Sequence, residues 1–224
     1  MSQENNTVEP FSVRDCALVA IATGKRAENL RELRDHLMNI HQGSIYYHFW
    51  GSLLRPKFDD PQFNNDFAVW SHYSLHDEVL AERLAIIDPK DYDDLEALRR
   101  ELIDVIEQRL DEIHSPEWVG PGKQFHFIRS QMVVFDTGWR IDNPEHLPNL
   151  VMRMSAGSIF YHVIDARRRF PKGLDDFSAW LAGFGDEYAP ACKALASVDP
   201  YYVTLIELRR KIGSVLRSCF RQEF

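Results

Sequence analysis

The sequence predicts an α+β fold that is mostly α-helical, with a repeated unit of about 110 residues arranged around a small sheet. One observation is that the chain matches itself at an offset of 114 residues, which is typical of an internal duplication. The other is that each copy has a β-rich stretch followed by about four stretches with helical spacing. Because a duplicated unit inherits the packing of a twofold homodimer, we expect pseudo-twofold symmetry and one compact domain.

The repeat is clearest in one short segment, because GSIYYH at residues 43–48 returns as GSIFYH at residues 157–162. Three further motifs recur in the same order: TGxRxxN at 23–29 and 137–143, DFxxW at 66–70 and 176–180, and LRR at 98–100 and 208–210. We therefore expect a first repeat over residues 11–113 and a second over residues 123–220. Residues 114–122 (HSPEWVGPG) are rich in proline and glycine and are the predicted linker.

Each repeat is expected to open with a strand. Residues 124–135 are rich in β-branched and aromatic side chains and predict a strand, and residues 11–21 are its weaker counterpart. The Thr-Gly pairs at 23–24 and 137–138 are expected to end the two strands. Cys16 lies within the first strand, where burial would keep its thiol protonated and inert.

The rest of each repeat is expected to be helical. Leu30, Leu33 and Leu37 have the spacing of one helix face, and they predict a helix over 28–40 with a shorter counterpart over 146–154. A helix over 44–54 follows, and Asn65 and Asp175 are suited to cap the helices after that. The repeats close with amphipathic helices over 92–110 and 202–220.

Charge and composition restrict the classes of function. With 26 Lys and Arg against 34 Asp and Glu, the net charge is −8, which argues against a general electrostatic grip on nucleic acid or on an anionic membrane. The first ten residues have no feature of a secretory signal, and no long apolar run occurs, so we expect a cytoplasmic protein. The three cysteines have no CxxC spacing and indicate reduced thiols.

The negative charge is concentrated in one part of the chain. Residues 57–117 contain 17 acidic side chains and 6 basic ones. One interpretation is a solvated helix surface. The other is an acidic face that binds a basic protein partner, including the C-terminal half of a second copy, so we expect a monomer or a homodimer.

The repeated GSIxYH segment is the candidate site. Helical spacing places polar side chains of each copy along one stripe, namely Ser44, Tyr47, His48 and Arg55 in the first copy and Ser158, Tyr161, His162, Asp165 and Arg169 in the second. The opposite faces are apolar, so both helices should be buried and their polar groups must find partners.

Three interpretations of these stripes remain open. In the first, His48 and His162 are structural and form hydrogen bonds with Asp66 and Asp176 or with backbone groups. In the second, the stripes face each other across the pseudo-axis, and their arginines and imidazoles line a pocket for a small anionic metabolite. Metal binding by the histidines is a weaker third interpretation.

No motif for a nucleophile or a phosphate-binding loop occurs, so we expect a non-catalytic regulatory or ligand-binding protein with no cofactor and no metal. It would bind a small anionic metabolite or a protein partner. The alternative is a metal- or histidine-dependent hydrolase acting on a phosphorylated or sugar-like small molecule. In that enzyme His48 or His162 would be the base, Asp165 or Asp176 would orient it, and Arg169 would bind the anion.

Several runs of residues are similar to a known family. SIYYHFW, NNDFAVW, LAERLAIIDP, FHFIRS, GSIFYHVIDARRR, DDFSAW and DPYYVTLIELRR occur in an order that resembles an uncharacterised bacterial and archaeal family, domain of unknown function 5752. The resemblance extends from about Phe11 to Leu216. It implies a cytosolic stand-alone protein with no assigned activity, so it assigns a role to no residue.

Overall fold

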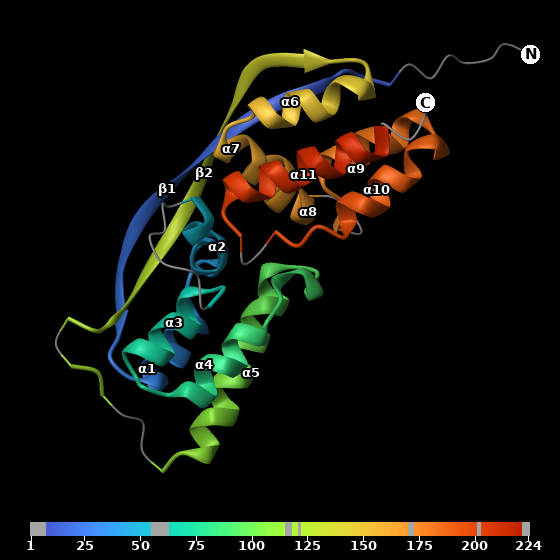
Figure 1. Cartoon of the computed structure of the whole chain (residues 1–224). Helices are drawn as coiled ribbons and strands as arrows, with labels where there is room; N and C mark the ends of the chain where they lie inside the picture. Colours follow the sequence, from blue (N-terminus) through green and yellow to red (C-terminus); the bar gives the residue numbers. More distant parts are fainter. Residues whose placement is uncertain are drawn as a thin grey trace, which may run out of the picture. The chain divides into compact units, whose positions relative to one another are not determined.

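The computed structural model describes residues 8–54, 63–114, 118–120, 122–169, 173–200 and 203–220. This part of the chain is mostly helical and contains one two-stranded sheet (Figure 1). The predicted α+β class with a helical majority is therefore confirmed.

The sheet is a ribbon of two long strands, β1 (Phe11–Ala27) and β2 (Phe125–Ile141). The Thr23 hydroxyl donates to the carbonyl of Phe127 (2.6 Å), and the Thr137 hydroxyl donates to the carbonyl of Val13 (2.8 Å). Residue numbers thus rise along one strand as they fall along the other, so the two strands are antiparallel.

The Thr-Gly pairs do not end the strands, and that prediction is wrong. Each strand is 17 residues long and continues past its glycine. Gly24 and Gly138 have φ angles of 75° and 77°, a left-handed conformation that glycine adopts without strain and that is typical of a bulge within a strand. The glycines therefore mark irregularities inside the strands.

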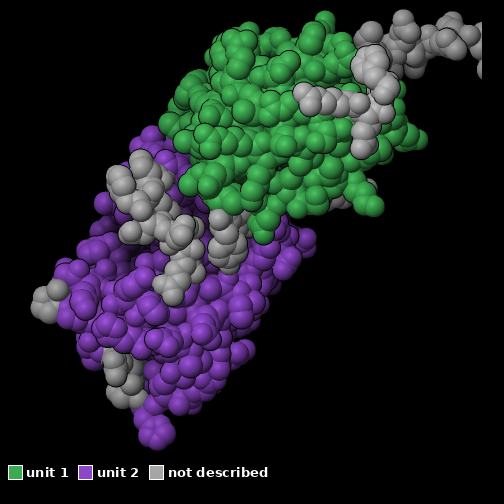
Figure 2. All heavy atoms as spheres, in the orientation of Figure 1, with its two compact units in different colours: residues 1–17, 133–224 green, residues 18–132 purple. Residues whose placement is uncertain are grey.

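The chain forms two compact units, coloured separately in Figure 2. Unit 1 contains residues 1–17 and 133–224, and unit 2 contains residues 18–132. Both strands are divided between the units, so the units do not coincide with the two predicted repeats. In each unit, the helices of one predicted repeat pack against the beginning of the strand that belongs to the other.

The helices of unit 2 begin at capping residues. Asn29, Asn65 and Asp94 each accept a hydrogen bond from a backbone N–H in the first turn of the following helix, and Asn65 was predicted to do so. The elements are α1 (Leu30–Leu37), α2 (Gln42–Trp50), η1 (Gly51–Leu54), α3 (Asp66–Tyr73), α4 (Glu78–Ile86), η2 (Pro89–Asp91) and α5 (Leu95–Glu112). The predicted helix over 28–40 is too long at both ends, because Asn29 caps α1 and the helix ends at Leu37.

In unit 1, the helix that carries the second stripe is not a regular α-helix. It consists of α7 (Ala156–Ile159), a π-helix η4 (Phe160–Asp165) and α8 (Ala166–Arg169). Asp175 caps the next helix, as predicted, by accepting from the N–H of Ser178. The remaining elements are η3 (Pro144–His146), α6 (Leu147–Arg153), α9 (Asp176–Leu181), η6 (Ala182–Phe184), η7 (Asp186–Tyr188), α10 (Ala189–Ala196) and α11 (Leu205–Phe220).

Each unit has an aromatic core where a strand meets the helices. In unit 2 the buried side chains include Phe67, Phe125 and Phe127, and in unit 1 they include Phe11 and Phe177. Burial of such rings removes a large apolar area from water and is the main force that holds strand and helices together. Within the described ranges, no helix is both long enough and apolar enough to span a membrane.

Candidate functional site

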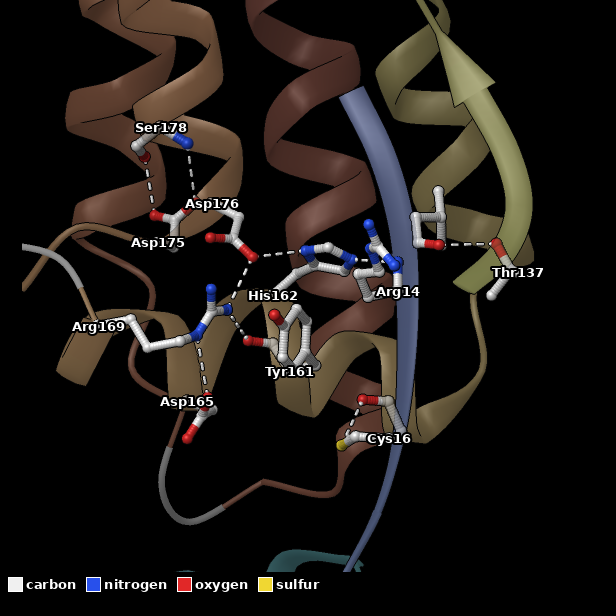
Figure 3. Close-up of polar contacts among 12 residues, drawn as sticks. Arg14, Cys16, Thr137, Tyr161, His162, Asp165, Arg169, Asp175, Asp176 and Ser178 are labelled. Atoms are coloured by element: carbon white, nitrogen blue, oxygen red, sulfur yellow. Dashed lines mark hydrogen bonds and ion pairs between the residues drawn. The ribbon is translucent and has the colours of Figure 1, made fainter. Parts of the chain in front are cut away.

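In unit 1, His162 joins the first strand to the helices (Figure 3). Its Nε2 atom accepts a hydrogen bond from the backbone N–H of Arg14 (2.9 Å), and its Nδ1 atom lies 2.6 Å from Oδ2 of Asp176. Because a backbone N–H only donates, Nε2 must be unprotonated, so the proton sits on Nδ1 and is donated to Asp176. His162 is only 2% exposed, and both of its ring nitrogens have partners inside the fold.

His48 occupies the corresponding position in unit 2. Its Nε2 atom accepts from the backbone N–H of Ile128 (3.2 Å), and its Nδ1 atom lies 2.9 Å from Oδ2 of Asp66. The hydroxyl of Ser44 donates to the carbonyl of Ile128 (2.8 Å). Both backbone groups of Ile128 are thus satisfied by side chains of α2, which take the place of a further strand at this point of the ribbon.

An aromatic residue anchors each strand beside its histidine. In unit 1 the Phe11 ring packs against His162, Phe177 and Trp180, with centroid distances of 5.0, 5.4 and 5.5 Å. The indole N–H of Trp180 donates to the carbonyl of Glu9 (2.8 Å). The strand is therefore held by one buried ring and by hydrogen bonds to its backbone.

Unit 2 repeats this arrangement with residues shifted by 110 or 114 positions. The Phe125 ring packs against His48, Phe67 and Trp70, with centroid distances of 4.7, 5.1 and 5.7 Å. The indole N–H of Trp70 donates to the carbonyl of Lys123 (2.8 Å). We call the helical surface that holds the strand in each unit the strand acceptor; His162, Phe177 and Trp180 define it in unit 1, and His48, Phe67 and Trp70 define it in unit 2.

A glycine in each acceptor lets the strand approach closely. A Cβ atom at Gly157 would collide with the Asp15 carboxylate and with the carbonyl of Cys16. The Cys16 thiol donates to the carbonyl of Gly157 (3.3 Å), and in unit 2 the Ser130 hydroxyl does the same to Gly43 (3.3 Å). Burial, with the nearby negative charge of Asp15, raises the pKa of the Cys16 thiol to about 12, so the thiol stays protonated.

Arg169 lies beside the strand acceptor of unit 1 and contacts residues of the π-helix and of α9. Its guanidinium donates to Asp165 (3.0 Å), to Asp176 (2.9 Å) and to the carbonyl of Tyr161 (2.9 Å), and it lies 4.0 Å above the centroid of the Tyr161 ring. The side chain is 34% exposed. The π-helix brings Tyr161, His162 and Asp165 into this cluster, and such widened turns are frequent at functional sites.

A family model described as a family of unknown function, DUF5752, matches residues 8–217. The chain belongs to this family. The resemblance predicted from the sequence is confirmed.

The DUF5752 chain is also similar to a solved structure of OrfY from Thermoproteus tenax. The two are 26% identical, the match covers 94% of this chain and 95% of that chain, and the TM-score is 0.79. No curated protein matches the chain in sequence.

The structure of the DUF5752 chain gathers only part of each predicted stripe. Tyr161, His162, Asp165 and Arg169 form one polar cluster, whereas Ser158 lies at the other end of the segment and accepts from the Ser155 hydroxyl (3.1 Å).

In unit 2, Ser44, Tyr47 and His48 are buried on α2, and a Cβ at Gly51 would stand 2.9 Å from the nearest atom of the Tyr47 ring. Arg55 lies outside the described residues. Within the described ranges, no group of three or more His, Cys, Asp and Glu side chains is arranged to hold a metal ion.

Backbone partners for the two histidines were expected, but the strand residues that supply them were not identified. The backbone N–H groups of Arg14 and Ile128 carry no signal in a sequence, because every residue except proline has one. The sequence does contain one indication of these strand contacts. Phe11 and Phe125 are separated by 114 residues, the same offset that separates His48 from His162. The hydrogen bonds to Asp66 and Asp176, expected in the structural interpretation, are present.

Proposed function

We propose that this DUF5752 protein is a non-catalytic binding protein whose strand acceptors recognise an extended β-strand. The observation that carries this proposal is that Nε2 of His162 and of His48 each accept a backbone N–H from a strand. Binding of an extended segment through backbone hydrogen bonds, with a pocket for an alternate side chain, is an established mode of peptide recognition. In this chain the bound segments are its own strands.

The contacts of the histidines favour binding over catalysis. A histidine base needs a free nitrogen within hydrogen-bond reach of the proton that it removes. In His162 the free lone pair is already used by Arg14, and the ring is buried beneath Phe11. Either histidine would gain a free nitrogen only after its strand had left, so the hydrolase alternative receives less support than a binding role.

The charges around Arg169 favour a peptide over a small anionic metabolite. Arg169 carries one positive charge, whereas Asp165 and Asp176, which it contacts, carry two negative charges. A phosphate or carboxylate would have to displace one of these carboxylates and then approach the other. An extended backbone presents no net charge and needs only the donors and acceptors that are already in place.

The two acceptors support an internal duplication. The tryptophan, histidine and threonine contacts of unit 1 each have a counterpart in unit 2, made by residues of the same type. We propose that the chain carries two copies of one ancestral strand-binding unit. We also place it in the cytoplasm, a proposal supported by its three free cysteines.

A second candidate surface is the acidic face predicted for residues 57–117, of which the structure describes residues 63–114. Asp91, Asp93, Asp104 and Asp111 are exposed there and, within the described residues, have no ion pair. We propose a basic protein partner for this face. Its binding should weaken severalfold between low salt and about 0.15 M salt, where the Debye length is about 8 Å.

A labelled peptide tests the proposed strand recognition. The full-length chain carrying Phe11→Ala has a weakened strand of its own, and we expect it to bind a fluorescent peptide of residues 8–17. The matched control carries Trp180→Ala in addition, which removes the indole donor and part of the ring pocket, and should bind at least tenfold more weakly. The proposal would be contradicted if the single and the double variant bound the peptide equally well, or if neither of them bound it.

A panel of phosphoester and glycoside substrates tests the catalytic alternative. We expect the wild-type chain to show no turnover, with or without added divalent metals. The hydrolase alternative would be supported if the wild-type chain showed turnover and both His48→Gln and His162→Gln lost it. Circular dichroism must show that these variants keep their fold.

A further inference from the structure

We propose that the strand acceptor of unit 1 also takes the N-terminal strand of a second copy of this chain, which gives a strand-exchanged dimer. This inference rests on the proposed recognition of an extended strand and names the partner that supplies it. The donor segment is Glu9–Cys16.

The donor segment meets unit 1 through contacts that do not depend on the chain in between. The carbonyl of Glu9 accepts from Trp180, the N–H of Arg14 donates to His162, and the Cys16 thiol donates to Gly157. The partners of these groups lie 141 to 171 residues further along the sequence. The same segment of a second copy can form every one of these contacts, which is the condition for exchange of an identical element between protomers.

The fold already uses this exchange between its own halves. The acceptor in the second predicted repeat holds the strand of the first, and the acceptor in the first predicted repeat holds the strand of the second. Phe11 and Phe125 fill equivalent ring pockets, and Cys16 and Ser130 bond to equivalent glycine carbonyls. An acceptor that takes its strand from a distant stretch of the same chain needs no new geometry to take it from another chain.

The acceptor of unit 1 favours a second copy over an unrelated strand. Backbone contacts accept any sequence, so selection depends on side chains of the donor. Phe11 must fill the ring pocket, Cys16 must reach the carbonyl of Gly157, and the guanidinium of Arg14 lies 3.3 Å from Asp136 on β2. A second copy carries all three features at the correct spacing.

Two full-length variants with complementary defects test the exchange. Phe11→Ala damages the donor and leaves the acceptor intact, whereas Trp180→Ala damages the acceptor and leaves the donor intact. When the two are mixed and warmed to just below their melting temperatures, one intact donor meets one intact acceptor. We expect a heterodimer by size-exclusion chromatography with light scattering, at least tenfold more abundant than the dimer of either variant alone.

The matched control mixes Phe11→Ala with Val13→Ala and should give no heterodimer. Val13 lies within the donor segment and is only 1% exposed, so both variants are defective in the donor. If the variants fail to fold, wild-type chains with two different affinity tags replace them. Warming should produce a dimer that carries both tags, and a tenfold excess of the peptide of residues 8–17 should dissociate it, whereas the same peptide with Phe11→Ala should not.

The two proposals fail in different ways. If the peptide binds the Phe11→Ala chain but no mixture yields a heterodimer at any concentration, the second copy is excluded as the partner and strand recognition stands. If a heterodimer forms but the peptide does not dissociate it, the dimer uses another surface and the exchange is excluded. If the peptide binds no variant and no heterodimer forms, both proposals are overturned.

Discussion

The backbone N–H of Arg14 donates to Nε2 of His162 across 148 residues of sequence. This single hydrogen bond joins the first strand of the chain to helices that are made from its second half. The same imidazole donates its one N–H, on Nδ1, to Asp176, so one side chain fixes both a strand and a helix.

Replacement of His162 by alanine should destabilise the fold by about 3 kcal/mol. The change leaves the Arg14 N–H without an acceptor and opens a cavity under Phe11, and each effect is worth about 1–3 kcal/mol in a buried site. Urea unfolding followed by circular dichroism measures the loss. His126→Ala is the control, because His126 is exposed on β2 and should change stability by less than about 0.5 kcal/mol.

Alanine at three glycines should produce a graded loss of stability. Gly157→Ala places a methyl group against Asp15 and the carbonyl of Cys16, so we expect a loss of about 1–3 kcal/mol. Gly43→Ala should lose less, because its Cβ meets the His41 ring and the carbonyl of Ser130 at 3.0 Å. Gly120→Ala meets nothing within 4 Å and should be neutral, so equal losses at all three positions would contradict the close approach of strand and helix.

Cys16 should react with a thiol reagent only when the strand opens. Burial and the negative charge of Asp15 raise the pKa of its thiol to about 12, so at pH 8 almost none of it is thiolate. We expect mass spectrometry to show alkylation of Cys16 at least a hundredfold more slowly in the native chain than in urea. Trp180→Ala should accelerate this native reaction, because it loosens the strand that carries Cys16.

Acid should remove a stabilising contribution from Asp136. Hydrogen bonds from the Arg140 guanidinium and from the N–H of Gly138 hold the pKa of this carboxyl well below its ordinary value. Because the pKa is lower in the folded state than in the unfolded state, the contribution is complete above about pH 4 and is lost as the pH falls below that. Asp136→Asn should therefore be less stable than wild type at pH 7 and should depend less steeply on pH below 4 in urea titrations. Parallel curves for the two proteins would contradict this.

The capped starts of two helices could be predicted from the sequence because the capping signal is local, whereas the ends of the helix predicted over 28–40 could not. Asn65 and Asp175 cap their helices through bonds to N–H groups three residues away, and such a pattern can be read directly. The positions of His48 and His162 on buried helix faces also follow from local periodicity.

Within one chain, the packing of each strand against the strand acceptor of the other predicted repeat could not be predicted in this way. The alternation of apolar and polar residues along a strand predicts that one face is buried. It does not predict which of two similar helical surfaces covers that face. Phe11 fits beside Phe177 in the same manner as Phe125 fits beside Phe67, so the sequence contains no preference that simple inspection can find. The π-helix at Phe160–Asp165 was also unpredictable, because its residues differ little from those of the regular helix α2.

The division of each unit between distant parts of the chain determines the order in which the protein can fold on the ribosome. Unit 2 needs Ile128 to reach His48, 80 residues earlier, so it can be completed while the chain is still growing. Arg14 is made first but must wait for His162, which at about 5–20 residues per second takes about 7 to 30 s. During that interval the N-terminal strand lacks its native acceptor, the one in unit 1, on its own chain, and neighbouring chains on the same messenger RNA that are further extended can supply one.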